Sequence, residues 1–113
     1  MYDGEKRILI DLDEVLNQYG KDSYNKNYIP EMKEGTVEFL TELSKNAELY
    51  LFTSRNLLIS AKWLIDNNID KYFKDITCTK LPSFLYIDDR AICFDGSFDV
   101  TLNKIKNFKT YWN

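Results

Sequence analysis

Two apolar runs in this chain lead into paired acidic residues, and this pattern constrains the fold more than any other feature. The run RILID over residues 7–11 ends at Asp11 and continues to Asp13, and the run SFLYI is followed by Asp88 and Asp89. A continuous apolar run of this length is typical of a strand that is covered on both faces of a parallel sheet. Ligands bind beyond the carboxyl ends of strands in such sheets, so the acids predict a site at that edge.

Helical patterns alternate with the apolar runs. Apolar residues recur at helical spacing over residues 31–46 and 56–68, and the second of these helices is expected to bury Leu57, Ala61, Leu64 and Ile65. Further strands are predicted at residues 48–52, 74–78 and 91–94, a polar loop at residues 17–30 and a last helix at residues 101–111. This alternation predicts a single α/β domain over residues 1–113, with a mostly parallel, five-stranded sheet flanked by helices in a three-layer, Rossmann-like arrangement.

Composition removes several kinds of chemistry. The chain has no histidine, which excludes Ser-His-Asp and Cys-His catalysis and every histidine-based zinc site. The formal charge of −3 offers no overall basic field for nucleic acid, and the lysines within residues 104–109 are expected on a solvated helix face. Cys78 and Cys93 are expected to be buried free thiols of a cytoplasmic protein. No apolar run is long enough to span a membrane.

Polar side chains follow four separate segments of the predicted sheet. They are Asp11, Asp13, Thr53, Ser54, Arg55, Lys80, Asp88 and Asp89. Four carboxylates in one crevice cannot all stay ionised without a cation. Ligand atoms that are all oxygen favour a hard divalent ion, so the sequence predicts Mg²⁺ as a cofactor. Two other roles stay open in this set: Ser54 as a helix N-cap, and Arg55 as the partner of a carboxylate.

The stretches ILIDLDEVL, LYLFTSR, TKLP and FLYIDDRAICF resemble the four motifs of the haloacid dehalogenase (HAD) superfamily, in order, over most of the chain. The resemblance implies a Mg-dependent phosphohydrolase of a small branch without a cap domain. It implies that Asp11 is the nucleophile that forms an aspartyl-phosphate and that Asp13 is the general acid and base. It also implies that Thr53, or Ser54 in its place, binds the phosphoryl group, and that Lys80 offsets its charge.

The same resemblance implies a set of metal ligands. They are the side chain of Asp11, the backbone carbonyl of Asp13 and one acid of the pair Asp88 and Asp89. Asp88 is favoured as the direct ligand, with Asp89 behind it. Arg55 and Arg90 are candidates for phosphate contact, and each has the alternative of pairing with a nearby carboxylate.

The chain departs from the family pattern at two positions. Glu14 stands where many members have glycine after the second acid, so a different loop is expected there. Leu81 separates Lys80 from Pro82, where the family often has Lys-Pro directly, and this puts the position of Lys80 in doubt.

The segments between the motifs are too short for a full cap. Something else must therefore screen the site: the loop carrying Tyr19, Tyr24 and Tyr28, a second subunit of a homo-oligomer, or the substrate itself. The substrate is expected to be a phosphorylated small molecule, such as a nucleotide or a sugar phosphate, or the phosphorylated end of a macromolecule.

Two other classes of protein use similar residues. A receiver-like signalling domain also places acids, a hydroxyl and a lysine at strand ends, but it needs a phosphoacceptor acid after the third strand. The predicted third strand, KDITC, has none at its end. A non-catalytic binding or regulatory protein on a HAD-like scaffold is the second alternative, and Glu14 is the feature that favours it.

Overall fold

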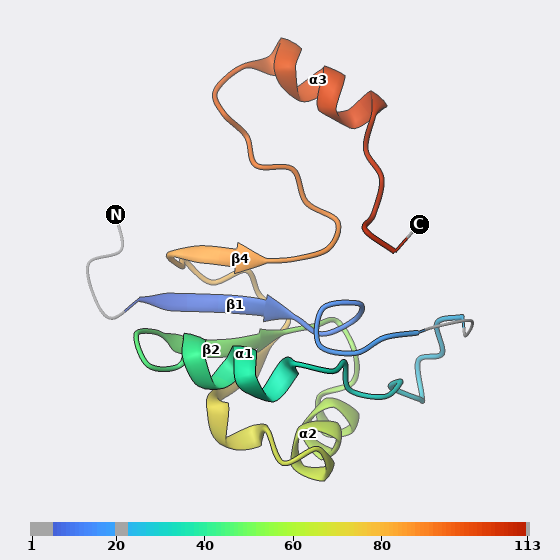
Figure 1. Cartoon of the computed structure of the whole chain (residues 1–113), viewed down its shortest axis with the longest axis vertical. Coiled ribbons are helices and arrows are strands. Elements are labelled where there is room, and N and C mark those ends of the chain that lie inside the picture. Colours follow the sequence, from blue (N-terminus) through green and yellow to red (C-terminus); the bar gives the residue numbers. More distant parts are fainter. Residues whose placement is uncertain (1–5, 20–22, 113) are drawn as a thin grey trace.

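The computed structural model describes residues 6–19 and 23–112, and in this part of the chain it shows four parallel strands and three α-helices (Figure 1). The elements follow one another as β1 (Arg7–Asp11), α1 (Thr36–Leu43), β2 (Glu48–Phe52), α2 (Leu57–Asp66), a short 3-10 turn, β3 (Phe73–Thr77), β4 (Leu85–Ile87) and α3 (Phe98–Lys106). The fold is therefore of the α/β class, with a parallel sheet flanked by helices, as the sequence predicts.

The strand order is β3-β2-β1-β4, which puts the first strand in the interior of the sheet. Ile10 of β1 is level with Leu51 of β2 on one side and with Ile87 of β4 on the other. Ile8, Leu9 and Ile10 are all buried, which explains why β1 reads as a continuous apolar run.

The core lies between the sheet and two helices. Leu40 of α1 and Trp63 and Leu64 of α2 join the same buried cluster as Ile8 and Leu51 of the sheet. Both helices therefore cover the face of the sheet on which these two side chains lie. The indole of Trp63 also donates a hydrogen bond to the carbonyl of Pro30, 3.0 Å away, and so fixes the polar loop to the core.

The predicted fifth strand is wrong. Residues 91–94 form no strand, because the chain bends at Asp89 and Arg90 and leaves the sheet after the three residues of β4 (Figure 1). The last helix begins three residues earlier than predicted, at Phe98, since the side chain of Ser97 caps it by accepting a hydrogen bond from the amide of Val100.

The predicted apolar face of the second helix is wrong in part. Leu64 is buried, but Leu57 and Ile65 are 58% and 61% exposed, and the helix instead buries Ser60 and Trp63. The N-cap of this helix is Asn56 and not Ser54, because the Asn56 side chain accepts hydrogen bonds from the amides of Leu58 and Ile59, the second and third residues of the helix.

A helical layer on the second face of the sheet is not observed within residues 6–19 and 23–112. Helix α3 stands away from the sheet, and none of its residues is buried (Figure 1). The expectation of buried thiols also fails: Cys78 and Cys93 are free but exposed, since both lie in segments that leave the sheet. None of the helices in the described part of the chain has the length and apolar character that a membrane crossing needs.

Candidate active site

Three carboxylates meet where the strand order reverses. Asp11 is the last residue of β1, and Asp88 and Asp89 directly follow β4, which lies beside β1 and parallel to it. After β3 the chain passes to the other side of β1, so these strand ends form the switch point of the sheet. One oxygen from each of the three carboxylates lies within 4.8 Å of the others. The sequence predicted correctly that these three acids would meet.

The environment of Asp11 disfavours its charged form. Burial is the largest cause, and the negative charges of Asp88 and Asp89 add to it, so the pKa of Asp11 is raised to about 8. One oxygen of Asp11 accepts a hydrogen bond from the amide of Leu12 at 2.9 Å, which acts in the opposite direction but is outweighed. A cation among the three acids would reverse this balance.

Asp88 and Asp89 differ in their surroundings. Asp88 is exposed, and one of its oxygens accepts a hydrogen bond from the amide of Arg90. The Asp89 side chain is only 6% exposed, and its carboxylate accepts a hydrogen bond from the indole nitrogen of Trp112 at 2.9 Å. The guanidinium of Arg90 lies 4.0 Å from the same oxygen of Asp89. Asp88 is therefore the more accessible of the two.

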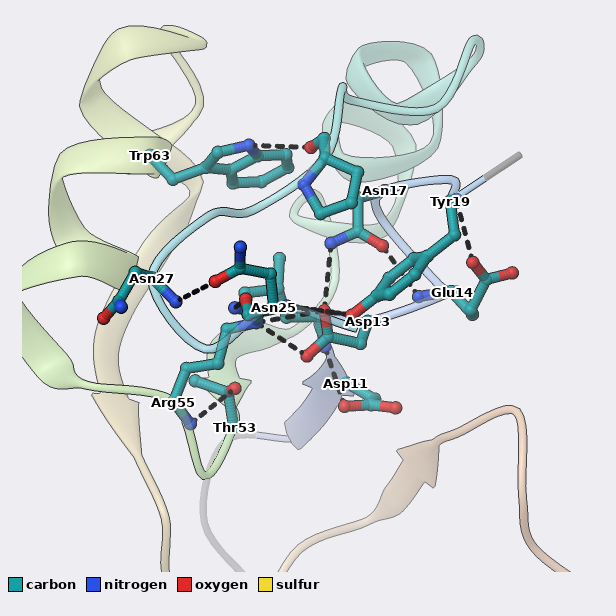
Figure 2. A network of polar contacts seen from close by, with 12 residues as sticks. Asp11, Asp13, Glu14, Asn17, Tyr19, Asn25, Asn27, Thr53, Arg55 and Trp63 are labelled. Carbon is teal, nitrogen blue, oxygen red and sulfur yellow. Dashed lines mark hydrogen bonds and ion pairs between the residues drawn. The ribbon is translucent and has the colours of Figure 1, made fainter. Parts of the chain in front are cut away.

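The side chain of Asp13 is bound by Arg55 (Figure 2). The Nε atom of Arg55 lies 3.0 Å from each carboxylate oxygen, and the Tyr19 hydroxyl and the Asn17 amide also donate to Asp13. Burial alone raises the pKa of Asp13, but these donors outweigh it, so the pKa of Asp13 lies below the ordinary value for aspartate. Of the two roles left open for Arg55, the structure shows the pairing with a carboxylate.

Arg55 also holds the tyrosine-rich loop in place. Its side chain is 1% exposed, and it donates hydrogen bonds to the Tyr19 hydroxyl and to the carbonyl of Asn25, both at 2.8 Å (Figure 2). Its guanidinium lies 4.5 Å from the centre of the Tyr24 ring. The buried side chain of Arg55 thus joins the segment after β2 to Asp13 and to the tyrosine-rich loop.

Glu14 forms the turn that a glycine would make most easily. Its φ angle is 65°, in the left-handed region that favours glycine. The amide of Glu14 donates to the buried side chain of Asn17, and its carboxylate accepts from the amide of Tyr19. The tight turn is therefore present despite the glutamate, and these hydrogen bonds offset its strain.

A cavity of about 870 Å³ opens above the acids. We call it the carboxylate cavity, because Asp11, Asp13, Asp88 and Asp89 are among the residues that line it. Its walls include two cations and four aromatic side chains: Lys33, Arg90, Tyr19, Tyr24, Tyr111 and Trp112. The C-terminal segment thus returns from α3 to close one side of the site.

Sequence reasoning did not identify the residues of this C-terminal wall. Tyr111 follows a helix that stands outside the core, yet its hydroxyl donates to the carbonyl of Glu14 and receives a hydrogen bond from Lys33 at 2.6 Å. Trp112 bonds to Asp89 across 23 positions of sequence. Nothing in the local pattern of LNKIKNFKTYW signals either contact. The aromatic end of this segment is the one feature that could have pointed to them.

The remaining predicted site residues lie at the edge of this arrangement or away from it. The Thr53 hydroxyl is buried and accepts a hydrogen bond from the amide of Arg55 at 3.2 Å, and Ser54 is exposed beside it. The ammonium of Lys80 lies 4.7 Å from the centre of the Tyr86 ring. Among the described residues that line the carboxylate cavity, none of Thr53, Ser54, Arg55 and Lys80 is included.

The chemistry of the three acids fits a hard cation. All three offer carboxylate oxygens, which are the ligands that Mg²⁺ prefers, and the described residues bring no soft sulfur or nitrogen ligand into the group. Burial, and after it the charges of Asp88 and Asp89, raise the pKa of Asp11, so a positive charge among the acids would favour its ionised form.

Comparison with protein-family models finds no match, and comparison with curated proteins finds none either. Among solved structures, the chain is similar to a conserved protein from Bacteroides thetaiotaomicron, with a TM-score of 0.61 and 21% sequence identity over 96% of each chain. An identity this low shows a shared fold and carries no information about activity.

Proposed function

We propose that this protein is a Mg-dependent phosphomonoesterase of the HAD superfamily, acting through an aspartyl-phosphate. The observation that carries the proposal is the meeting of Asp11, Asp88 and Asp89 at the ends of two neighbouring parallel strands. The order of the four sequence motifs gives independent support, because it assigns the same acids to one site.

The metal would be held by Asp11 and Asp88, the most accessible acid of the group, while Asp89 stays bonded to Trp112 behind them. When bound, Mg²⁺ keeps the Asp11 carboxylate ionised and neutralises charge on the phosphoryl oxygens. Every other part of the reaction is assigned to side chains of this chain.

Asp11 is the nucleophile. One of its oxygens forms a bond to phosphorus while the bond from phosphorus to the ester oxygen breaks, and the leaving alcohol takes a proton. Water then attacks phosphorus, the bond from the Asp11 oxygen to phosphorus breaks, and inorganic phosphate leaves with the Asp11 carboxylate restored. The position at the end of β1 suits this role because the strand holds the carboxylate in the lining of the cavity.

Asp13 is the general acid and base. It gives its proton to the leaving alcohol in the first step and takes one from the attacking water in the second. Arg55 holds Asp13 ionised in the structure, so this ion pair has to loosen before Asp13 carries a proton. The negative charge of a bound phosphate favours protonation of Asp13, because it raises the free energy of a second anion beside it.

Four residues are assigned to the phosphate. Thr53 and Ser54 lie just beyond β2, whereas Arg55 is buried against Asp13 and would reach a phosphate only after that ion pair loosens. Lys80 is the least supported of the four, since it lies against Tyr86. Lys33 and Arg90 line the cavity and are better placed to contact an anion that enters it.

A non-catalytic binding protein on the same scaffold is the alternative. The contact between Arg55 and Asp13 favours it, because Nε of Arg55 donates to both carboxylate oxygens and Nη2 lies 2.9 Å from one of them, and a carboxylate engaged in this way is a poor proton carrier. A direct assay separates the two functions.

The test is phosphate release from an aryl phosphate, with and without Mg²⁺. We expect release that requires Mg²⁺ and falls at least a hundredfold in Asp11→Asn, because the amide is no nucleophile. Asp66→Asn is the matched control, since Asp66 lies on the exposed side of α2 in an ion pair with Lys62. Equal release by Asp11→Asn and wild type would contradict the proposal.

A further inference from the structure

We propose that the carboxylate cavity selects phosphate monoesters of nucleosides, and that Trp112 of the C-terminal segment provides the surface on which the base stacks. This inference rests on the proposed function and adds the class of leaving group to it.

The size of the cavity is the first observation. A volume of about 870 Å³ is far larger than a phosphate group needs and falls in the range of pockets that hold whole small-molecule ligands. The acids are among the residues that line it, and a phosphate bound to them would fill only a small part of this volume.

The walls are aromatic and partly uncovered. Tyr24, Tyr111 and Trp112 line the cavity, and they are 59%, 60% and 40% exposed. Aromatic surface gathered around one cavity is costly to leave in water and is typical of a binding site. The faces of such rings recognise flat, conjugated groups.

Hydrogen bonds fix the polar ends of two of these rings. The Trp112 indole donates to Asp89 at 2.9 Å, and the guanidinium of Arg90 lies 5.0 Å from its ring centre. The Tyr111 hydroxyl bonds to Lys33 and to the carbonyl of Glu14. The rings are therefore held in place before a ligand arrives, which lowers the entropy cost of stacking on them.

Trp112 connects the stacking surface directly to the reacting end of the site. Its nitrogen bonds to Asp89, and Asp89 is one of the three acids whose oxygens lie within 4.8 Å of one another. A base on the indole and a phosphate at Asp11 thus belong to one molecule, with a sugar between them. Hydrolysis of that molecule consumes one water and yields a nucleoside and inorganic phosphate.

The experiment compares nucleoside 5′-monophosphates with ribose 5-phosphate, which lacks only the base. Both are primary alkyl phosphates, so their intrinsic reactivity is matched. We expect kcat/KM for the nucleotides to exceed that for ribose 5-phosphate by about tenfold or more, through a lower KM. In Trp112→Ala this preference should fall about tenfold, whereas Trp112→Phe, which keeps a ring, should retain most of it. An unchanged preference in Trp112→Ala overturns the inference, as does equal use of both substrates by wild type.

A binding measurement separates this inference from the phosphatase proposal. A nucleoside monophosphate added with Mg²⁺ to Asp11→Asn should quench tryptophan fluorescence. The quench should vanish in the double variant that also carries Trp112→Phe, because the remaining tryptophan, Trp63, lies in the core away from the ligand. Quenching without turnover in wild type supports the inference and contradicts the phosphatase. Turnover without base dependence or quenching supports the phosphatase and overturns the inference.

Discussion

At the scale of single residues, the contact between Arg55 and Asp13 affects both the stability of the protein and the wall of the site. The Arg55 side chain is 1% exposed, while Asp13 retains 26% exposure, so the pair lies at the boundary between core and cavity. Removal of one partner from a buried pair leaves the other charge unpaired, which costs more than the pair itself contributes. The same contact anchors the loop through Tyr19 and Asn25, so a local change at Arg55 affects the whole wall of the site.

Replacement of Arg55 should therefore destabilise the protein. We expect Arg55→Met, which keeps an unbranched apolar stem but removes the guanidinium, to lower the free energy of unfolding by about 3 kcal/mol in urea denaturation at pH 7. The matched control is Lys62→Met, because Lys62 pairs with Asp66 at an exposed position of α2. This control should change the free energy of unfolding by less than about 0.5 kcal/mol. A similar loss in both variants would contradict the assigned role of Arg55.

The stability that Arg55 provides should depend on pH in a defined direction. The pKa of Asp13 is lower in the folded protein than in the unfolded chain. The contribution is therefore present at pH values above the unfolded pKa, about 4, and is lost as the pH falls through the folded value. The difference in unfolding free energy between wild type and Arg55→Met should narrow as the pH is lowered from 7 to 3. A difference that stays constant over this range would show that Asp13 is not the partner responsible.

At the scale of elements, local signals located most helices and strands but misplaced their ends and faces. The segment TSRN leaves Ser54 open as the cap of α2 when the sequence is read alone. The structure selects Asn56, since its side chain reaches the amides of Leu58 and Ile59 at 2.9 and 3.1 Å. This choice leaves Ser54 exposed beyond β2, next to Thr53.

The cap gives a second stability prediction. Asn56→Ala should lower the free energy of unfolding by about 1 kcal/mol, because the two amides of the first turn lose their acceptor. Ser54→Ala should change it by less than about 0.5 kcal/mol, since Ser54 is exposed and lies outside the helix. Thermal unfolding of both variants beside wild type checks the pair. The reverse order of effects would restore Ser54 as the cap.

At the scale of the whole molecule, helix α3 and the C-terminal segment that follows it differ in how they contact the rest of the protein. Helix α3 contributes no buried residue, yet the segment that follows it reaches the site, where Thr110 is buried and Trp112 bonds to Asp89. The stability of the fold therefore resides in the sheet with α1 and α2, whereas the C-terminal segment shapes the cavity.

Equivalent substitutions in the two helices should separate these roles. Leu40→Ala in α1 should lower the free energy of unfolding by about 3 kcal/mol, because Leu40 is fully buried in the core. Leu102→Ala in α3 should lower it by less than about 0.5 kcal/mol, since Leu102 is 58% exposed. Chemical denaturation of both variants measures the difference. A loss of similar size at Leu102 would show that α3 packs against the core in solution.

The sequence by itself determined the α/β class, the parallel strands and the acids at their ends. Apolar runs and helical spacing are local properties, and the carboxyl ends of neighbouring parallel strands must share one edge. These two properties predict that Asp11, Asp88 and Asp89 meet, as they do in the structure.

Only the tertiary structure decided the partners of those acids. The bond between Arg55 and Asp13 spans 42 positions, and the bond between Tyr111 and Glu14 spans 97. Contacts at such separations depend on how the chain returns to the sheet after each element, and no local pattern encodes that return. The same reason explains the missing fifth strand and the exposed α3, because both follow from the direction in which the chain leaves β4.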